Sequence, residues 1–223
     1  GASFTFDGTK LVLKLKGDNI AVGDNPIDYA RIAVYVDGKR VVDEMIDCAE
    51  KEVTVIDRTE NAQSVVEIIK LSESPMSAVG IEAFAEGSAE TLPEKPLKIE
   101  FIGDSITCGY GVDDEDENHQ FTTATEDVTK AYAYKTAKAL DAEYSMFSAS
   151  GYGIVSGYTE GDEPISEQTI PQFYCSYGFS RGNFAGTAPQ DIPWDFSKYI
   201  PQIIVINPVS YTHLRAHETK ANL

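Results

Sequence analysis

The sequence predicts two domains of different fold class: an N-terminal, jelly-roll-like β-sandwich and an α/β domain with a parallel sheet. Short strand-like runs separated by turn residues fill residues 1–88, with no helical periodicity between them. A polar segment with two prolines follows at residues 89–96, and we expect it to be the linker. Beyond it, residues 97–208 alternate strand, helix and strand, which is the order of a parallel βαβ unit.

The first domain carries a clear hairpin signal. Asp37-Gly38 follows the expected strand Arg31–Val36, and Lys39–Val42 is the expected return strand. The other expected strands are Ser3–Phe6, Leu11–Leu15, Glu52–Ile56, Ser64–Leu71 and Val79–Phe84. Such a sandwich can bind carbohydrate or can serve only as a structural partner of a catalytic domain. The sequence leaves both roles open, because it shows no obvious aromatic platform.

Charge and composition limit the possible partners. The chain has 223 residues, 42% of them hydrophobic, and a formal net charge of -18. Nucleic acid and anionic membrane surfaces would be repelled, whereas a neutral polysaccharide is compatible. No apolar run approaches the ~20 residues that a membrane span needs. The three cysteines lie far apart and suggest neither a metal site nor a disulfide framework. We expect no metal and no organic cofactor.

The second domain begins with the apolar strand Leu97–Ile102, which runs directly into Gly103-Asp104-Ser105. Apolar residues then recur at helical spacing over Glu126–Ala142, with Thr125 as the expected cap. The next expected strands are Tyr144–Ser148 and Gln202–Asn207, and the acidic run Asp113–Glu117 is expected to be a solvated loop.

Ser105 lies where a rigid strand gives way to a turn, which is where α/β hydrolases hold their nucleophile. The turn exposes the hydroxyl, and the helix that follows offers backbone N–H groups to a developing oxyanion. Gly-Asp-Ser is also a common turn sequence, so the tripeptide alone does not decide between catalysis and structure.

The run Ile102–Gly111 resembles the first block of the GDSL, or SGNH, hydrolases, and within them carbohydrate esterase family two, the acetylxylan esterases. In that subfamily a small β-sandwich precedes the hydrolase domain. The resemblance implies that Ser105 is the nucleophile. Ser150-Gly151-Tyr152-Gly153 resembles the second block, which implies that the Gly151 N–H joins that of Ser105 in the oxyanion hole. The alternative is an ordinary turn after a strand.

The chain departs from the family pattern after Asn207. Neither the third block, Gly-x-Asn-Asp, nor the catalytic Asp-x-x-His follows in the remaining residues. Residues 209–219 resemble the translation of a sequencing-library adapter, so we expect residues 209–223 to be a non-native tail. We therefore do not expect His213 or His217 to be the general base, and we expect His119 to be a surface residue.

The resemblance implies a serine esterase that removes acetyl groups from xylan or related polysaccharides and is secreted or periplasmic, although no signal peptide is visible in this chain. The alternatives are a GDSL lipase or esterase of other specificity, and a carbohydrate-binding protein with an inactive hydrolase-like domain. Because the third block and the general base of the family do not follow Asn207, we expect the α/β hydrolase domain, residues 97–208, to be incomplete at its C-terminus and this chain itself to be inactive. Tyr152 and Trp194 are candidates for a sugar-binding cleft, although the aromatic residues of this region could equally be packing under a long loop.

Overall fold

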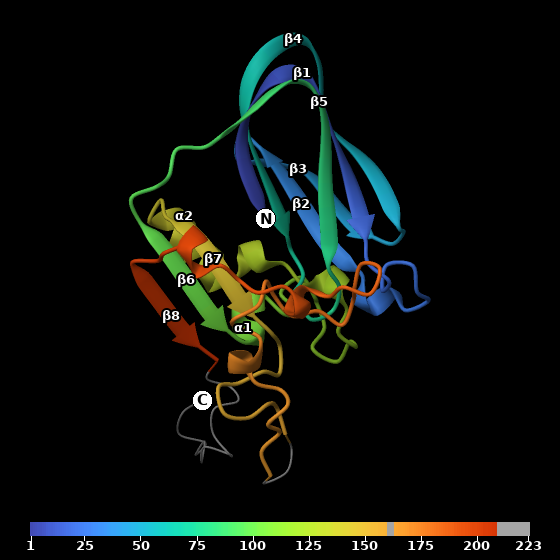
Figure 1. The fold of residues 1–223 in the computed structure, drawn as a ribbon. Helices are drawn as coiled ribbons and strands as arrows, with labels where there is room; N and C mark the ends of the chain where they lie inside the picture. Colours follow the sequence, from blue (N-terminus) through green and yellow to red (C-terminus); the bar gives the residue numbers. More distant parts are fainter. Residues whose placement is uncertain (160–162, 209–223) are drawn as a thin grey trace.

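The N-terminal part of the chain is one antiparallel sheet of five strands, in the order β3-β2-β4-β1-β5. The computed structural model describes residues 1–159 and 163–208 (Figure 1). The strands are β1 (Ala2–Gly17), β2 (Ala30–Val36), β3 (Lys39–Ile46), β4 (Glu50–Lys70) and β5 (Val79–Thr91). The expected antiparallel pairing is present, but β1 and β4 each join two runs that the sequence suggested were separate strands. β5 also extends three residues into the expected linker, 89–91.

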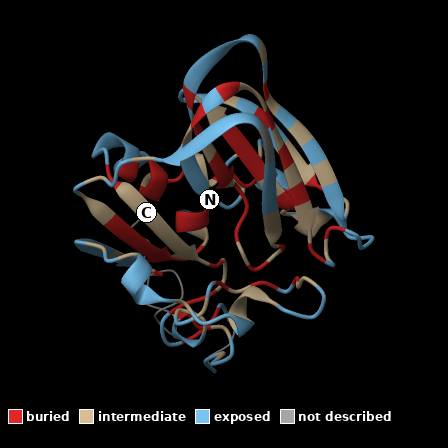
Figure 2. Ribbon diagram, turned by 45° about the horizontal axis from the view of Figure 1, so that its top comes forward, coloured by how far each residue is buried: buried red, intermediate tan, exposed pale blue. Residues whose placement is uncertain are grey.

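The sheet bends where Gly8 of β1 lies opposite Gly87 of β5. The pairing of β1 with both neighbours shifts register between Gly8 and Lys10. Gly87 has a φ of 153°, and a Cβ atom at either glycine would overlap backbone of the facing strand. The bend brings the two arms of the sheet onto a common core, which includes Leu13 from one arm and Val34 from the other. One folded sheet therefore encloses the core that we expected between the sheets of a sandwich (Figure 2).

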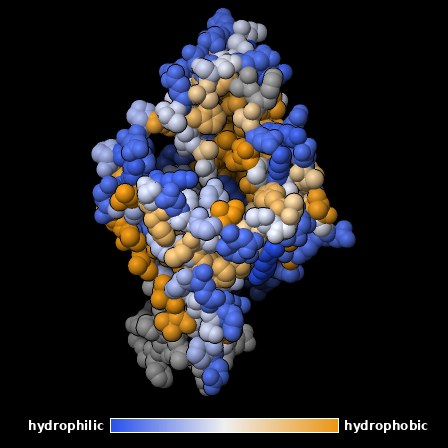
Figure 3. All heavy atoms as spheres, viewed as in Figure 1, coloured by the Kyte–Doolittle hydropathy of each residue, from blue (hydrophilic) through white to orange (hydrophobic). Residues whose placement is uncertain are grey.

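The second part contains three parallel strands in the order β7-β6-β8. They are β6 (Lys98–Gly103), β7 (Glu143–Ser148) and β8 (Ile203–Asn207). The register aligns their carboxyl ends, because Gly103 pairs with Ser148 on one side and with Asn207 on the other. Helix α2 (Tyr132–Ala139) packs Ala133 and Ala137 against Ile99 and Phe101 of β6. At the outer strand β8 the isoleucines Ile203, Ile204 and Ile206 are 45–61% exposed (Figure 3).

Helix α2 is much shorter than the expected Glu126–Ala142. Residues 126 and 127 are instead held against the N-terminal sheet by their fully buried side chains. Asp127 Oδ2 accepts from Arg40 Nη2 at 2.8 Å, and the Val128 amide donates to the Leu71 carbonyl at 3.1 Å. These tertiary bonds outweigh the local helical preference, so Thr125 does not cap a helix. None of the described helices is long and apolar enough to cross a membrane.

The two parts of the chain meet across charged groups as well as apolar ones. Arg31 of β2 bonds Asp43 within its own sheet, and it reaches Asp113 and the carbonyls of Ala124 and Glu126 in the second part. Asp113 also pairs with Lys130. The acidic run is therefore not entirely solvated, because its first residue, Asp113, pairs with Arg31 of β2 as well as with Lys130.

The bend predicts the effect of a small substitution. We expect Gly87→Ala to lower the free energy of unfolding by about 2 kcal/mol, because the added methyl group has no space beside the backbone of β1. Urea unfolding followed by circular dichroism measures this. The neighbouring exposed Ser88→Ala is the control and should change stability by less than about 0.5 kcal/mol. Equal stability of the two variants would contradict the close approach of the β1 and β5 backbones at Gly87.

Candidate active site

Ser105 is the first residue of α1 (Ser105–Cys108), a single turn that begins two residues after β6 ends. The buried Asp104 caps this turn, because its Oδ1 accepts from the Ile106 amide at 3.1 Å. Gly109, with φ 78°, ends it. A Cβ atom at Gly103 would overlap the Thr107 side chain, so glycine lets the turn fold back onto the strand end. The strand and the cap together fix the position of Ser105.

Gly151 follows β7 as Ser105 follows β6. Because Gly103 and Ser148 are paired, both residues lie at the same edge of the sheet. Gly151 has a φ of 81°, which a residue with a side chain would rarely adopt. Within the described part of the chain, neither the Ser105 nor the Gly151 amide donates to an acceptor. Two free N–H groups at the carboxyl-terminal edge of a parallel sheet can stabilise a negatively charged oxygen.

The Ser105 hydroxyl has no hydrogen-bond partner among residues 1–159 and 163–208. His119 lies in the acidic loop, where its side chain is 63% exposed and its Nδ1 is 2.8 Å from Asp114 Oδ1. It is thus the surface residue that we expected. His213 and His217, together with the rest of the expected tail 209–223, lie outside the described residues.

A polar chain that the sequence did not reveal lies beside this edge. Asn207, at the end of β8, donates through Nδ2 to the Tyr132 hydroxyl at 3.3 Å. The Tyr132 hydroxyl is in turn 3.1 Å from Thr107 Oγ1 on α1. The chain links β8, α2 and the turn that carries Ser105. No sequence motif singled out Tyr132.

Tyr152 and Trp194 occupy different surroundings. Tyr152 is 8% exposed and packs against Phe173 and Phe179, with ring centroids 6.1 and 5.4 Å away. Burial raises the pKa of its hydroxyl. Trp194 lies 5.9 Å from Tyr177 and lines a cavity of about 510 Å³ between the domains. Ser105 and Gly151 do not line this cavity, so these contacts favour packing, and a sugar-binding role for Tyr152 and Trp194 stays a prediction.

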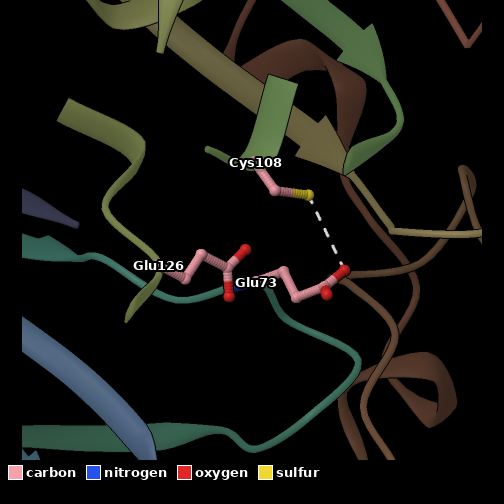
Figure 4. A group of neighbouring side chains, drawn as sticks. All are labelled: Glu73, Cys108 and Glu126. Carbon is pink, nitrogen blue, oxygen red and sulfur yellow. Dashed lines mark hydrogen bonds between the residues drawn. The ribbon is translucent and has the colours of Figure 1, made fainter. Parts of the chain in front are cut away.

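Glu73, Cys108 and Glu126 form a buried cluster between the N-terminal and C-terminal parts of the chain (Figure 4). Glu73 belongs to the loop between β4 and β5. Its Oε2 accepts from the Ser150 amide at 2.6 Å and from the Cys108 thiol at 3.6 Å. Glu126 Oε2 accepts from the Glu73 amide at 2.9 Å. The second carboxylate oxygen of each glutamate is buried without a partner in the described structure.

Burial sets the charges of this cluster. Desolvation raises the pKa of Glu126 to about 9 and also raises the pKa of Glu73. It raises the pKa of the Cys108 thiol and lowers that of Lys70 to about 8. Because Glu73 receives two donors at one oxygen, we assign the negative charge to Glu73 and the proton to Glu126. Lys70 supplies the positive charge while it donates to the carbonyls of Ser72 and Glu73.

The donor atoms of Glu73, Cys108 and Glu126 lie within 4.8 Å of one another, which is close enough to consider a metal ion. A metal would have to displace protons from Glu126 and Cys108 beside the charged Lys70, and this opposes binding. We therefore interpret the cluster as a hydrogen-bond network. No local sequence pattern indicates this network, because Glu73 lies in a polar, proline-containing segment that is typical of a loop.

Comparison with known proteins finds similarity to esterases that act on carbohydrate. The chain is similar to the cellulase/esterase CelE of Acetivibrio thermocellus, with 29% identity over 210 residues, 93% of this chain and 24% of that protein. It is also similar to an acetylxylan esterase/glucomannan deacetylase of Cellvibrio japonicus, with 28% identity over 204 residues, 89% of this chain and 51% of that protein. The chain thus spans about half, or less, of these curated relatives. No protein-family profile matches it.

Solved structures agree with these relatives. A family two carbohydrate esterase from Clostridium thermocellum, in complex with cellohexaose, superposes with a TM-score of 0.74 at 26% identity, covering 94% of this chain and 58% of that one. The acetyl xylan esterase Est2A of Butyrivibrio proteoclasticus shares the fold, with a TM-score of 0.80 at 22% identity over 95% of this chain and 56% of that one. The structural neighbours of the chain thus include family two carbohydrate esterases, and its curated relatives are esterases.

The buried acids predict how stability depends on pH. Because the folded-state pKa of Glu126 is about 9 and its ordinary value is 4.5, its stabilising contribution is complete at acid pH and declines as pH rises toward 9. The decline is at most about 1.4 kcal/mol per pH unit. Lys70 has the opposite effect, but only between pH 8 and 10.5.

We therefore expect Glu126→Gln, which resembles the protonated side chain, to flatten the fall in melting temperature between pH 5 and 8. Differential scanning fluorimetry across this range measures it. The loop variant Glu117→Gln is the control and should keep the wild-type slope. An unchanged slope in Glu126→Gln would show that Glu126 is already ionised in the folded protein.

Proposed function

We propose that the parent protein is a serine esterase that removes acetyl groups from xylan or a related polysaccharide, outside the cytoplasm, in the periplasm or after secretion. The observation that carries the proposal is the register of β6 and β7. Because these parallel strands end together, Ser105 and the free Gly151 amide lie at the same carboxyl-terminal edge of the sheet. The printed activities of the curated relatives and the cellohexaose bound to one structural neighbour support an acetylated polysaccharide as the substrate. The proposed reaction needs no metal and no organic cofactor.

In the proposed reaction, Ser105 Oγ attacks the acetyl carbonyl carbon and its proton passes to a base. The carbonyl oxygen becomes negatively charged and accepts from the Ser105 and Gly151 amides. The bond to the sugar oxygen then breaks, and that oxygen takes the proton. Water attacks the acetyl-serine in the same way and releases acetate.

We also propose that this chain by itself turns over slowly. A serine hydroxyl is a weak nucleophile unless a base lies within hydrogen-bond reach. In the described part of the chain, Ser105 Oγ has no such partner, and His119 is held by Asp114 on an exposed loop. An added small base that can enter the site should then restore part of the rate.

Hydrolysis of 4-nitrophenyl acetate with and without added imidazole tests whether Ser105 is the nucleophile and whether it lacks a base. We expect imidazole to raise the rate by at least about tenfold above that of Ser105→Ala under the same conditions, since a general base contributes about 10²–10⁴. Acetate release from acetylated xylan then tests the substrate class.

The outcomes separate the alternatives. A rate equal to that of Ser105→Ala at every imidazole concentration would contradict Ser105 as the nucleophile. Binding to xylan without any such rate would favour a carbohydrate-binding protein. Full Ser105-dependent turnover without imidazole would contradict the proposal that Ser105 has no base within hydrogen-bond reach in this chain.

A further inference from the structure

We propose that Glu73 of the N-terminal domain is a positioning residue that holds the oxyanion turn of the second domain in its active geometry. The proposal rests on the function proposed above, because it assigns the Gly151 amide a role in that reaction. It gives the N-terminal sheet a direct part in catalysis in addition to any part in binding carbohydrate.

The contact is made to the residue that precedes Gly151. Glu73 Oε2 accepts from the Ser150 amide at 2.6 Å, a short bond typical of a charged acceptor. The Ser150 amide and the Gly151 amide belong to successive peptide units. Fixing the first limits the directions in which the second can point. Within the described structure no other side chain accepts from the Ser150 amide.

The same oxygen also touches the turn that carries the nucleophile. Cys108 ends α1, which Ser105 begins, and its thiol donates to Glu73 Oε2 at 3.6 Å. Glu73 therefore contacts both segments whose amides are to meet at the substrate oxygen. One side chain from another domain can set the spacing between them.

Glu73 is itself held firmly. Its amide donates to Glu126 Oε2 at 2.9 Å, and its carbonyl accepts from Lys70 Nζ at 2.7 Å. Glu73 is only 5% exposed, so water does not compete for its carboxylate. A charged acceptor in such a buried site forms a stronger hydrogen bond with its donor than an exposed acceptor would.

The groups that face Glu73 are Glu126, Lys70, Cys108 and the Ser150 amide. Lys70 balances the charge of Glu73, whereas Glu126 and Cys108 remain neutral by burial. Neutralising Glu73 should therefore weaken its bond to the Ser150 amide, and Glu126 is then the remaining buried glutamate of the cluster that can balance the charge of Lys70.

Hydrogen exchange followed by mass spectrometry tests the proposal without requiring activity. We expect Glu73→Gln to speed exchange of a peptide covering residues 148–153 by about tenfold. The matched control is Glu67→Gln, which removes another carboxylate between the domains. Glu67 accepts from Tyr144 and Lys138 but does not touch the turn, so this peptide should keep its wild-type exchange in that variant.

The imidazole-supported reaction gives the second readout. We expect Glu73→Gln to lower kcat by about tenfold to a hundredfold and to change KM by less than about twofold, since the misplaced amide acts in the transition state. Glu67→Gln should keep the wild-type kcat. If Glu73→Gln does not fold, Glu73→Asp replaces it, because the shorter side chain keeps the charge but withdraws from the amide.

Equal exchange of residues 148–153 in the Glu73 and Glu67 variants would overturn the positioning role, whatever the kinetics show. A loss of stability in Glu73→Gln without local exchange would assign Glu73 a purely structural part. Absence of any Ser105-dependent rate in the wild-type chain would contradict the proposed function alone, because the exchange experiment is decided separately.

Discussion

Glu73 Oε2 lies where the two domains and two turns meet, and much of the structure is arranged around it. The loop between β4 and β5 of the bent N-terminal sheet carries Glu73. The segment 126–128 does not form the expected helix but bonds to this loop and to Arg40 of β3. The parallel strands then bring Ser150 and Cys108 to the same oxygen. A buried carboxylate is costly unless donors surround it, so these partners fix the approach of the domains.

Parallel register is the second constraint on the site. Gly103 pairs with both Ser148 and Asn207, so all three strands end at one edge. The capped turn at Asp104 and the positive φ of Gly151 then leave two amides without acceptors in the described structure. The architecture separates two tasks: strands and turns place the proposed oxyanion donors, while the N-terminal domain steadies them.

Much of this was predictable from local chemistry. The apolar run before Gly103-Asp104-Ser105 predicted β6 and its turn, and the Asp37-Gly38 hairpin was found between β2 and β3. The merging of strands into β1 and β4 was not predicted, because a bend in one strand has the same turn residues as a break between two. Glu73 and Glu126 were missed because their roles depend on contacts across more than fifty positions of the chain, which no local pattern reveals.

The amide proton resonance of Ser150 reports directly on the hydrogen bond by which Glu73 holds the oxyanion turn. In the ¹H–¹⁵N NMR spectrum of the wild-type chain, a short bond to a buried carboxylate should place this proton well downfield of an ordinary loop amide. We predict that Glu73→Gln moves the Ser150 proton resonance upfield and that Glu67→Gln leaves it in place. An unshifted Ser150 resonance in Glu73→Gln would contradict the claim that this carboxylate holds the turn.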